Sequence, residues 1–196
     1  SDLTPQHGLL AGEEEVTWLS TSQMRGVKTF AQDDLYVTVG AGTPIHELQS
    51  FLQARGMQAP LATPWPEMSI GGLMAANLNA PLRMRYGALR DLILATTVAL
   101  ADGRVIRAGR SVVKNVAGYD LPKIFVGSQG TLGLLTDITL KLIPAPRAQR
   151  TLCVPVDSLQ KGLTLARQLL PQALVASAVL VAEDAQLPGL DAAPYT

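Results

Sequence analysis

The most constraining feature of this chain is a glycine-rich stretch, Gly127 to Gly133, that leads directly into a largely apolar run from Leu132 to Leu142. Glycine stands at every third position, which leaves main-chain N–H groups uncovered by side chains, and Ser128 and Thr131 add hydroxyl donors. Such a loop, anchored on a strand, suits a phosphate or the edge of a heteroaromatic ring. A plain glycine turn before a strand is the alternative, and the loop alone does not separate the two.

A second glycine pair, Gly71-Gly72, follows Ser69 and opens an apolar segment of helical character. Glycines here allow close approach of the backbone, and the first N–H groups of a helix favour negative charge. Two glycine-rich turns, one before a helix and one before a strand, are more simply explained by one extended ligand than by two separate ones.

A competing motif lies earlier, where Leu35–Val39 has strand character and runs into Gly40-Ala41-Gly42. This order resembles the start of a dinucleotide-binding G-x-G-x-x-G turn, but Ile45 occupies the third glycine position. The acidic residue expected about twenty positions later is also absent, since residues 60–64 are apolar and proline-rich. We therefore expect a tight strand-to-helix corner, with Pro44 in the first helical turn.

Composition narrows the class of protein. The chain has 196 residues with 47% hydrophobic and 16% charged side chains, which predicts a substantial core rather than a disordered tail. The net charge of +0 gives no argument for nucleic-acid binding. Cys153 is the single cysteine, so a disulfide scaffold is excluded. We find no signal peptide at the start of the chain, and the longest apolar runs, about nine residues, are too short for a membrane span.

Positive charge is concentrated in one part of the sequence. Between Arg83 and Lys114 the chain carries seven basic residues and only two acidic ones, Asp91 and Asp102. This stretch could attract an anionic substrate or a diphosphate, or it could be an ordinary solvated face. We favour the solvated face, except for Arg85, Arg90 and Lys114.

The apolar patterning predicts an α+β domain. We expect a helix over 44–54, a helix from Gly71, a short helix over 121–125 with Asp120 as its cap, and strands over 35–39, 92–101, 105–108 and 132–142. Asp102-Gly103 is a hairpin turn, and Pro144-Ala145-Pro146 closes the domain. Beyond it, strand 151–156, helix 158–169 capped by Asp157 or Ser158, and strand 173–181 form a β-α-β fragment.

Several of these motifs together resemble a known family. GYDLPKIFVGSQGTLGLLT, residues 118–136, closely resembles the signature of FAD-linked oxidases of the vanillyl-alcohol oxidase type. Upstream, the SIGG turn at 69–72, the Tyr86-Gly87 pair and the Asp102-Gly103 hairpin occur in that family's order. KNVAGYD at 114–120 is similar to the variant in the flavin subunit of bacterial glycolate oxidase and its relatives. The resemblance covers about residues 20 to 146.

The resemblance implies an FAD-binding domain over 1–148, followed at 149–196 by the start of an α/β cap that would hold the substrate. The family's pyrophosphate loop is not recognisable in Leu9–Gly12, so the N-terminal part looks truncated, and Leu73 and Ala80 also depart from the family's usual residues. By resemblance the cofactor-binding residues are Ser69, Ile70, Gly71, Gly72, Asn77, Tyr86, Gly87, Gly127, Ser128, Gly130, Thr131 and Gly133.

The implied activity is FAD-dependent oxidation of a 2-hydroxy acid such as glycolate or lactate, within a complex of partner subunits. We assign no catalytic residue, because His7 and His46 lie outside the matched motifs, and no metal ligands. This chain alone is expected to be an incomplete enzyme. The expected location is the cytoplasm, with any membrane association made through partner subunits. The alternative is a non-catalytic assembly subunit that keeps the fold without FAD.

Overall fold

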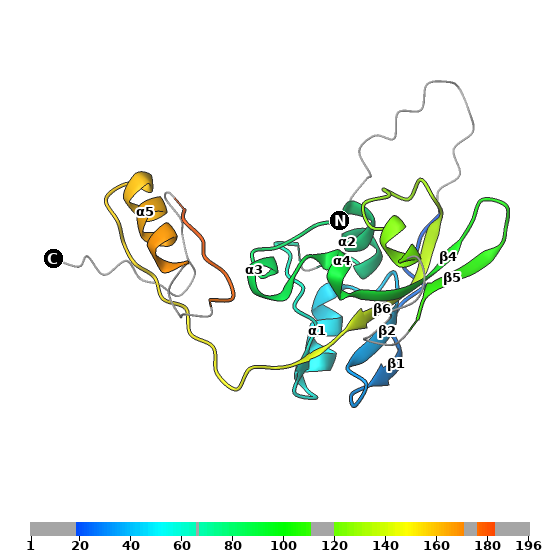
Figure 1. Ribbon diagram of the computed structural model, residues 1–196. Coiled ribbons are helices and arrows are strands. Elements are labelled where there is room, and N and C mark those ends of the chain that lie inside the picture. Colours follow the sequence, from blue (N-terminus) through cyan, green and yellow to red (C-terminus); the bar gives the residue numbers. More distant parts are fainter. Residues whose placement is uncertain (1–18, 66, 111–119, 171–175, 183–196) are drawn as a thin grey trace, which may run out of the picture.

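The computed structural model describes residues 19–65, 67–110, 120–170 and 176–182, and its main feature is a five-stranded sheet (Figure 1). The strands lie in the order β1-β2-β6-β4-β5. Their bounds are β1 Val27–Ala31, β2 Tyr36–Gly40, β4 Ile93–Ala99, β5 Val105–Gly109 and β6 Leu134–Lys141. Two short strands, β3 Met57–Gln58 and β7 Ile143–Pro144, form a separate pair. The strands expected over 35–39, 92–101, 105–108 and 132–142 are therefore confirmed as β2, β4, β5 and β6.

Every pairing in the large sheet is antiparallel. A dinucleotide-binding βαβ unit requires parallel neighbours, so the sheet rules out that reading of Gly40-Ala41-Gly42. The β4–β5 hairpin turns at Asp102-Gly103 as expected, with the Asp102 carboxylate accepting a hydrogen bond from the Arg104 N–H at 3.0 Å.

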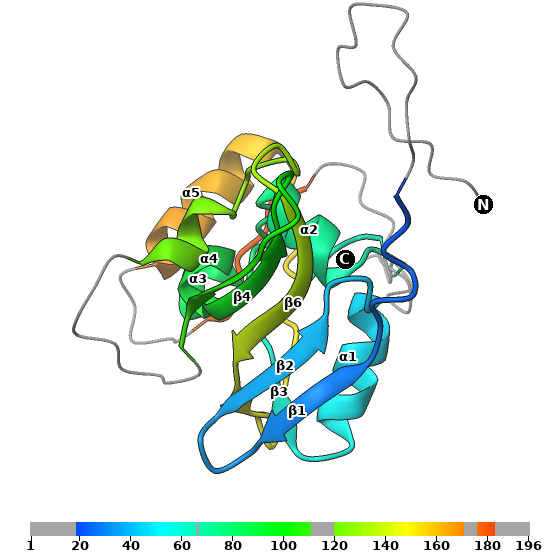
Figure 2. The same cartoon turned by 90° about the vertical axis from the view of Figure 1, so that its right-hand side faces the viewer.

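Two helices cover one face of the sheet, α1 Ile45–Gln53 and α2 Ile70–Ala76 (Figure 2). Their apolar side chains recur with helical spacing and are buried against the strands, as the sequence periodicity predicts. The core comprises Ile45, Leu48 and Leu52 from α1, Ile70, Leu73 and Met74 from α2, and Val37, Val39, Val98, Ile138 and Leu140 from the sheet. This packing fixes α2 on the sheet, at the position from which both of its ends reach a glycine-rich loop.

Short helices complete the domain. They are α3 Arg83–Tyr86, α4 Leu89–Leu92 and the 3-10 helix η1 Leu121–Ile124. Asp120 begins η1, but its side chain makes no capping hydrogen bond and instead pairs with the Lys123 ammonium at 2.5 Å. The expectation that Asp120 caps this helix through its side chain is thus wrong, because the neighbouring cation takes the carboxylate.

The C-terminal segment differs from the β-α-β expectation. Its helix is present as α5 Leu159–Leu169, with the Ser158 hydroxyl accepting from the Lys161 N–H, and it lies apart from the sheet in Figure 1. Residues 151–156 are exposed and form no strand, and neither do residues 176–181, while 171–175 lie outside the described residues. Pro155 lacks the N–H that a ladder needs, and no described strand lies beside this segment to pair with it.

A buried polar pair lies in the middle of the sheet. Thr38 on β2 stands directly opposite Thr139 on β6, and their hydroxyl oxygens are 2.9 Å apart. Both residues are almost fully buried, at 9% and 2% exposure. Each hydroxyl therefore depends on the other for its hydrogen bond.

We predict that Thr38→Val destabilises the protein by about 1–3 kcal/mol, because it leaves the Thr139 hydroxyl buried without a partner. The double variant Thr38→Val/Thr139→Val should lose much less than the sum of the single losses, since both polar groups are removed together. Urea unfolding measures this, with exposed Thr29→Val as the control that should change little. Strictly additive losses would contradict the pairing.

Candidate functional site at the ends of helix α2

Helix α2 connects the two glycine-rich motifs. At its start Ser69 has extended backbone angles, and its hydroxyl accepts from the Gly72 N–H at 3.0 Å, which is standard N-capping. The serine of the SIGG turn therefore begins the helix, as the sequence indicates.

The other first-turn N–H groups of α2 are also occupied by the protein. Ile70 donates to the Thr43 carbonyl at 2.9 Å, and Gly71 donates to the Ala41 carbonyl at 2.7 Å. The expectation of unsatisfied N–H groups that favour an anion here is therefore wrong. The reason is that α2 begins directly against the turn that joins β2 to α1.

Steric contact explains why three glycines surround this turn. A Cβ on Gly71 would lie 2.9 Å from the Ala41 Cβ and carbonyl oxygen. On Gly40 it would lie 2.2 Å from the Met24 carbonyl oxygen, and on Gly42 it would lie 2.0 Å from the Thr21 carbonyl oxygen. These glycines permit close backbone packing between segments of the protein, which confirms the tight-corner interpretation of Gly40 and Gly42.

The opposite end of α2 meets the glycine-rich loop after η1. The Gly127 and Gln129 N–H groups donate to the carbonyls of Met74 and Ala75, each at 3.0 Å. Asn77 ends the helix in the left-handed conformation, with φ 51°. The bond from Gln129 satisfies the Ala75 carbonyl, which the helix end leaves unpaired, and the bond from Gly127 is a second one for Met74, which also accepts from the Asn77 N–H at 3.1 Å. Backbone hydrogen bonds thereby join two motifs that are about fifty residues apart in sequence. We call this contact between the end of α2, residues 74–77, and the loop, residues 127–131, the α2–loop junction.

Within the loop, most backbone donors are used internally. Ser128, Thr131 and Gly133 donate to the carbonyls of Phe125, Ser128 and Gly130 at 3.3, 2.9 and 3.4 Å. The Thr131 hydroxyl also donates to the Ser128 carbonyl, at 2.6 Å. Among the described residues, the N–H groups of Gly130 and Leu132 make no backbone hydrogen bond. The loop thus offers two donors, fewer than its glycine content suggests.

Asn79 connects the junction to the Tyr86-Gly87 turn. Its Nδ2 donates to the backbone oxygen and to the Oδ1 of Asn77, at 3.0 and 3.1 Å. Its Oδ1 accepts from the Leu89 N–H at 2.8 Å. A Cβ on Gly87 would lie 3.0 Å from the Asp91 carboxylate, so glycine is needed at this turn. The sequence motifs give no signal for Asn79, because only the fold places Leu89 beside it.

An apolar pocket of about 440 Å³ opens beside Asn79. Two segments form its walls, lined by Ala62, Thr63, Pro64 and Trp65 on one side and Leu78, Asn79, Ala80 and Pro81 on the other. Trp65 is 55% exposed, so a large aromatic face is presented at the surface. Polar amides beside an apolar wall are typical of small-molecule sites.

The structure divides the predicted site residues into two groups, apart from Gly133, which packs against β4, where a Cβ would lie 2.7 Å from the Val98 Cγ1. Asn77, Gly127, Ser128, Gly130 and Thr131 meet at the junction, and Tyr86-Gly87 connects to it through Leu89 and Asn79. Ser69, Ile70, Gly71 and Gly72 lie at the other end of α2, about 10 Å along the helix axis at 1.5 Å per residue.

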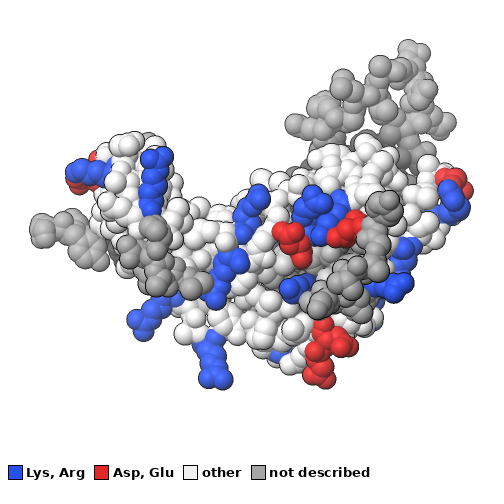
Figure 3. Space-filling view, in the orientation of Figure 1, with Lys and Arg blue, Asp and Glu red and all other residues white. Residues whose placement is uncertain are grey.

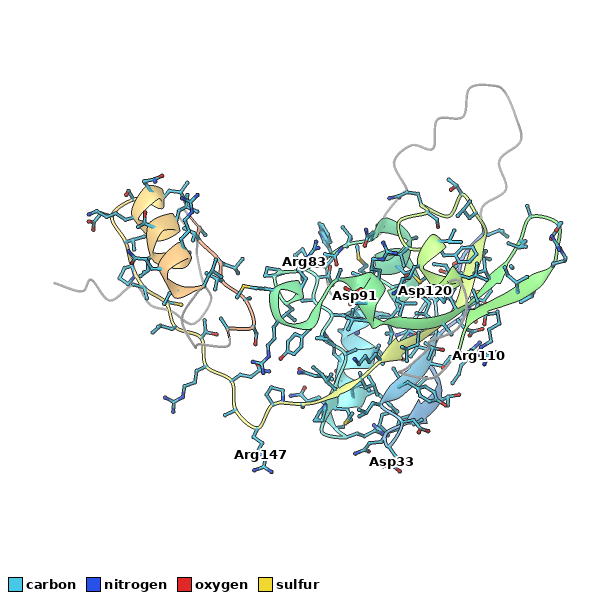
Figure 4. The ribbon with its side chains drawn as sticks, viewed as in Figure 1. Asp33, Arg83, Asp91, Arg110, Asp120 and Arg147 are labelled. Atoms are coloured by element: carbon cyan, nitrogen blue, oxygen red, sulfur yellow. The ribbon has the colours of Figure 1, made fainter. Side chains whose placement is uncertain are left out.

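The basic stretch does not form an uninterrupted patch on the face shown in Figure 3, where acidic side chains lie among the basic ones. Arg104 pairs with Asp102 at 2.7 Å, next to it in the β4–β5 turn. A basic and an acidic side chain, Arg83 on α3 and Asp91 on α4, come from successive short helices (Figure 4). Arg83 also lines a small cavity beside Asn79. Lys114 lies outside the described residues. This intermixing supports the solvated-face reading.

His46 lies on the exposed side of α1, with its Nδ1 3.7 Å from the Glu67 carboxylate. His7 lies outside the described residues. Within the described ranges, no group of three or more His, Cys, Asp or Glu residues gathers as metal ligands. The same part of the chain holds no helix long and apolar enough to cross a membrane.

We predict opposite effects for the adjacent glycines of α2. Gly71→Ala should cost about 1–3 kcal/mol of stability, because its Cβ meets Ala41 at 2.9 Å. Gly72→Ala meets only the Ser69 hydroxyl, at 3.2 Å, and should gain part of the roughly 0.5–1 kcal/mol by which alanine is favoured within a helix. Thermal or urea unfolding measures both, and equal losses would contradict the packing role of Gly71.

The chain matches the family model described as FAD binding domain over residues 4–109. It is 38% identical to glycolate oxidase subunit GlcE of Escherichia coli K12 over 130 residues, which are 65% of this chain and 37% of that protein. It is 32% identical to a D-lactate dehydrogenase of Archaeoglobus fulgidus over 165 residues, covering 82% of this chain and 37% of that protein.

The fold is similar to that of a solved alkyldihydroxyacetonephosphate synthase, with a TM-score of 0.57 and 22% identity, over 65% of this chain and 23% of that chain. The region that this chain shares with the E. coli and A. fulgidus relatives spans 37% of the length of each relative. The family match covers more than half of the 196 residues and includes all of α2 and the β2–α1 corner. The chain therefore belongs to the family of FAD-binding domains.

Proposed function

We propose that this chain holds the ring system of a noncovalently bound FAD at the α2–loop junction, within an oxidoreductase that acts on a 2-hydroxy acid such as glycolate or lactate. The names of the E. coli and A. fulgidus relatives support the substrate class. The assignment is made for the parent protein, of which residues 1–148 would be the FAD domain and 149–196 the start of the substrate domain.

The observation that carries the proposal is the junction itself. Its backbone bonds hold Asn77 beside Gly127, and a Cβ on Gly127 would lie 3.3 Å from the Asn77 Cβ. The exposed Gly130 and the pocket beside Asn79 flank this contact. An open glycine surface next to apolar walls and amide donors fits a flat, polar-edged heteroaromatic ring.

The residues at the junction would bind and orient the cofactor. FAD, when bound, supplies the acceptor for the hydride that leaves the substrate's hydroxyl carbon. The exposed glycines would let the ring approach the backbone, and the Asn77 carboxamide and the Gly130 N–H would offer it donors. His46 lies on α1 beside Glu67 rather than at the junction, and both histidines stand outside the matched motifs. We therefore assign no base, and we place the base and the cations for the substrate carboxylate in the substrate domain.

Partner subunits are part of the proposal, since one relative is named as a subunit of glycolate oxidase. We propose a cytoplasmic complex, with any membrane contact made by those partners. A second candidate is an assembly subunit that keeps the fold without FAD. The observation in its favour is that the Ile70, Gly71, Gly127 and Gln129 N–H groups all bind the protein's own carbonyls.

The visible spectrum of the parent protein mixed with FAD and then desalted separates these two functions, whereas this chain alone, without a recognisable pyrophosphate loop, is expected to hold FAD weakly or not at all. For the parent protein we expect retained flavin absorbance, with free FAD released into the supernatant after acid precipitation, because no described histidine or cysteine lies at the junction. A colourless protein would support the assembly subunit. Colour that stays with the precipitate would show a covalent bond and contradict the proposal.

A matched pair of glycine variants tests the location. Gly130 and Gly103 have φ angles of +77° and +83°, and a Cβ on either meets no atom within 4 Å. Gly130→Val and Gly103→Val should therefore carry similar backbone strain, roughly 1–3 kcal/mol. We expect flavin retention to be lost only in Gly130→Val, measured by absorbance of folded protein. Equal retention in both variants would move the site elsewhere.

A further inference from the structure

The orientation of the Asn77 carboxamide follows from a chain of hydrogen bonds that begins at a backbone group. The Leu89 N–H can only donate, and it lies 2.8 Å from one end of the Asn79 carboxamide. That end must be oxygen, so the amino group of Asn79 faces the other way. The backbone donor alone fixes this orientation, because an N–H cannot accept a hydrogen bond.

The orientation of the Asn77 carboxamide follows from that of Asn79. The Asn79 amino group lies 3.1 Å from one end of the Asn77 carboxamide, and this end must accept, so it is Oδ1. The Asn77 amino group then points away from Asn79. A Cβ on Gly127 would lie 3.9 Å from that nitrogen, which places Asn77 Nδ2 on the glycine-loop side.

The Asn77 amino group is available for a ligand. Among the described residues it donates to no acceptor, and Asn77 is exposed. Reversing its carboxamide would bring two amino groups together and lose the bond from Asn79. The donor is therefore held outward before any ligand arrives, which lowers the ordering cost of binding.

We propose that Asn79 is a positioning residue that fixes Asn77 with its amino group toward the bound flavin, so that the site selects an acceptor atom on the ring edge. This rests on the proposed function and deepens it, since it names the chemistry that Asn77 contributes and the residue that sets it. The acceptor is a carbonyl oxygen or an unprotonated ring nitrogen.

Two substitutions test the donor of Asn77 and the orienting amino group of Asn79 separately. Asn77→Gly removes the donor and suits the left-handed backbone of this helix end, where φ is 51°. Asn79→Asp keeps an acceptor for the Leu89 N–H but replaces the amino group with an oxygen, so Asn77 turns to donate to it and presents Oδ1 to the flavin.

The test is FAD titration of the parent protein in a double-mutant cycle, with the dissociation constant and the absorption spectrum of bound flavin as readouts. We expect each single variant to weaken FAD by about tenfold or more. In the Asn77→Gly background, Asn79→Asp should have a clearly smaller effect, limited to its added charge and to the lost bond to the backbone oxygen of residue 77, because the carboxamide through which it acts is gone. Circular dichroism checks that each variant is folded.

The outcomes are distinct. A wild-type parent protein that binds no FAD contradicts the proposed function and the inference with it. FAD binding that is unchanged in Asn77→Gly overturns the inference and leaves the proposed function standing. An Asn79→Asp effect of equal size in both backgrounds also overturns it, since Asn79 would then act through charge or general structure. If Asn79→Asp does not fold, Asn79→Ala takes its place in the cycle, since it also removes the amino group that orients Asn77, and the same two outcomes decide.

Discussion

The end of helix α2 is the constraint on which the rest of the site depends. A helix leaves its last carbonyls short of donors, and here the Gly127 and Gln129 N–H groups donate to the carbonyls of Met74 and Ala75 at 3.0 Å, of which only Met74 has a donor in the helix end itself. The sheet places these groups together, because α2 packs on β6 and the loop leads directly into β6. The bonds that complete the helix therefore also fix the loop that would face the flavin.

Glycine in this domain serves packing more than anion binding. Gly40, Gly42 and Gly71 are where backbone segments approach each other too closely for a side chain. The N–H groups nearby are consumed by protein carbonyls. The described residues therefore suit the ring end of FAD better than its diphosphate, because few free N–H donors remain for a charged group.

Much of the fold could be predicted from the sequence, since α1, α2 and the strands bury side chains at regular spacing. The two tail strands could not, because residues 151–156 alternate like a strand but none of the described strands lies beside them. The sequence around Gly71 also predicted free N–H groups at the start of α2. The carbonyl that accepts from the Gly71 N–H belongs to Ala41, thirty positions away, and only the fold brings it there. Asn79 was missed for the same reason, since its role depends on Leu89, which only the folded chain brings beside it.

A crystal structure of the parent protein with FAD tests the central claim most directly. We expect the flavin ring to lie against Asn77 and Gly130, with the Ile70 and Gly71 N–H groups still donating to the carbonyls of Thr43 and Ala41. A diphosphate seated on the first turn of α2 in place of those carbonyls would contradict it. A ring bound away from the α2–loop junction would contradict it equally.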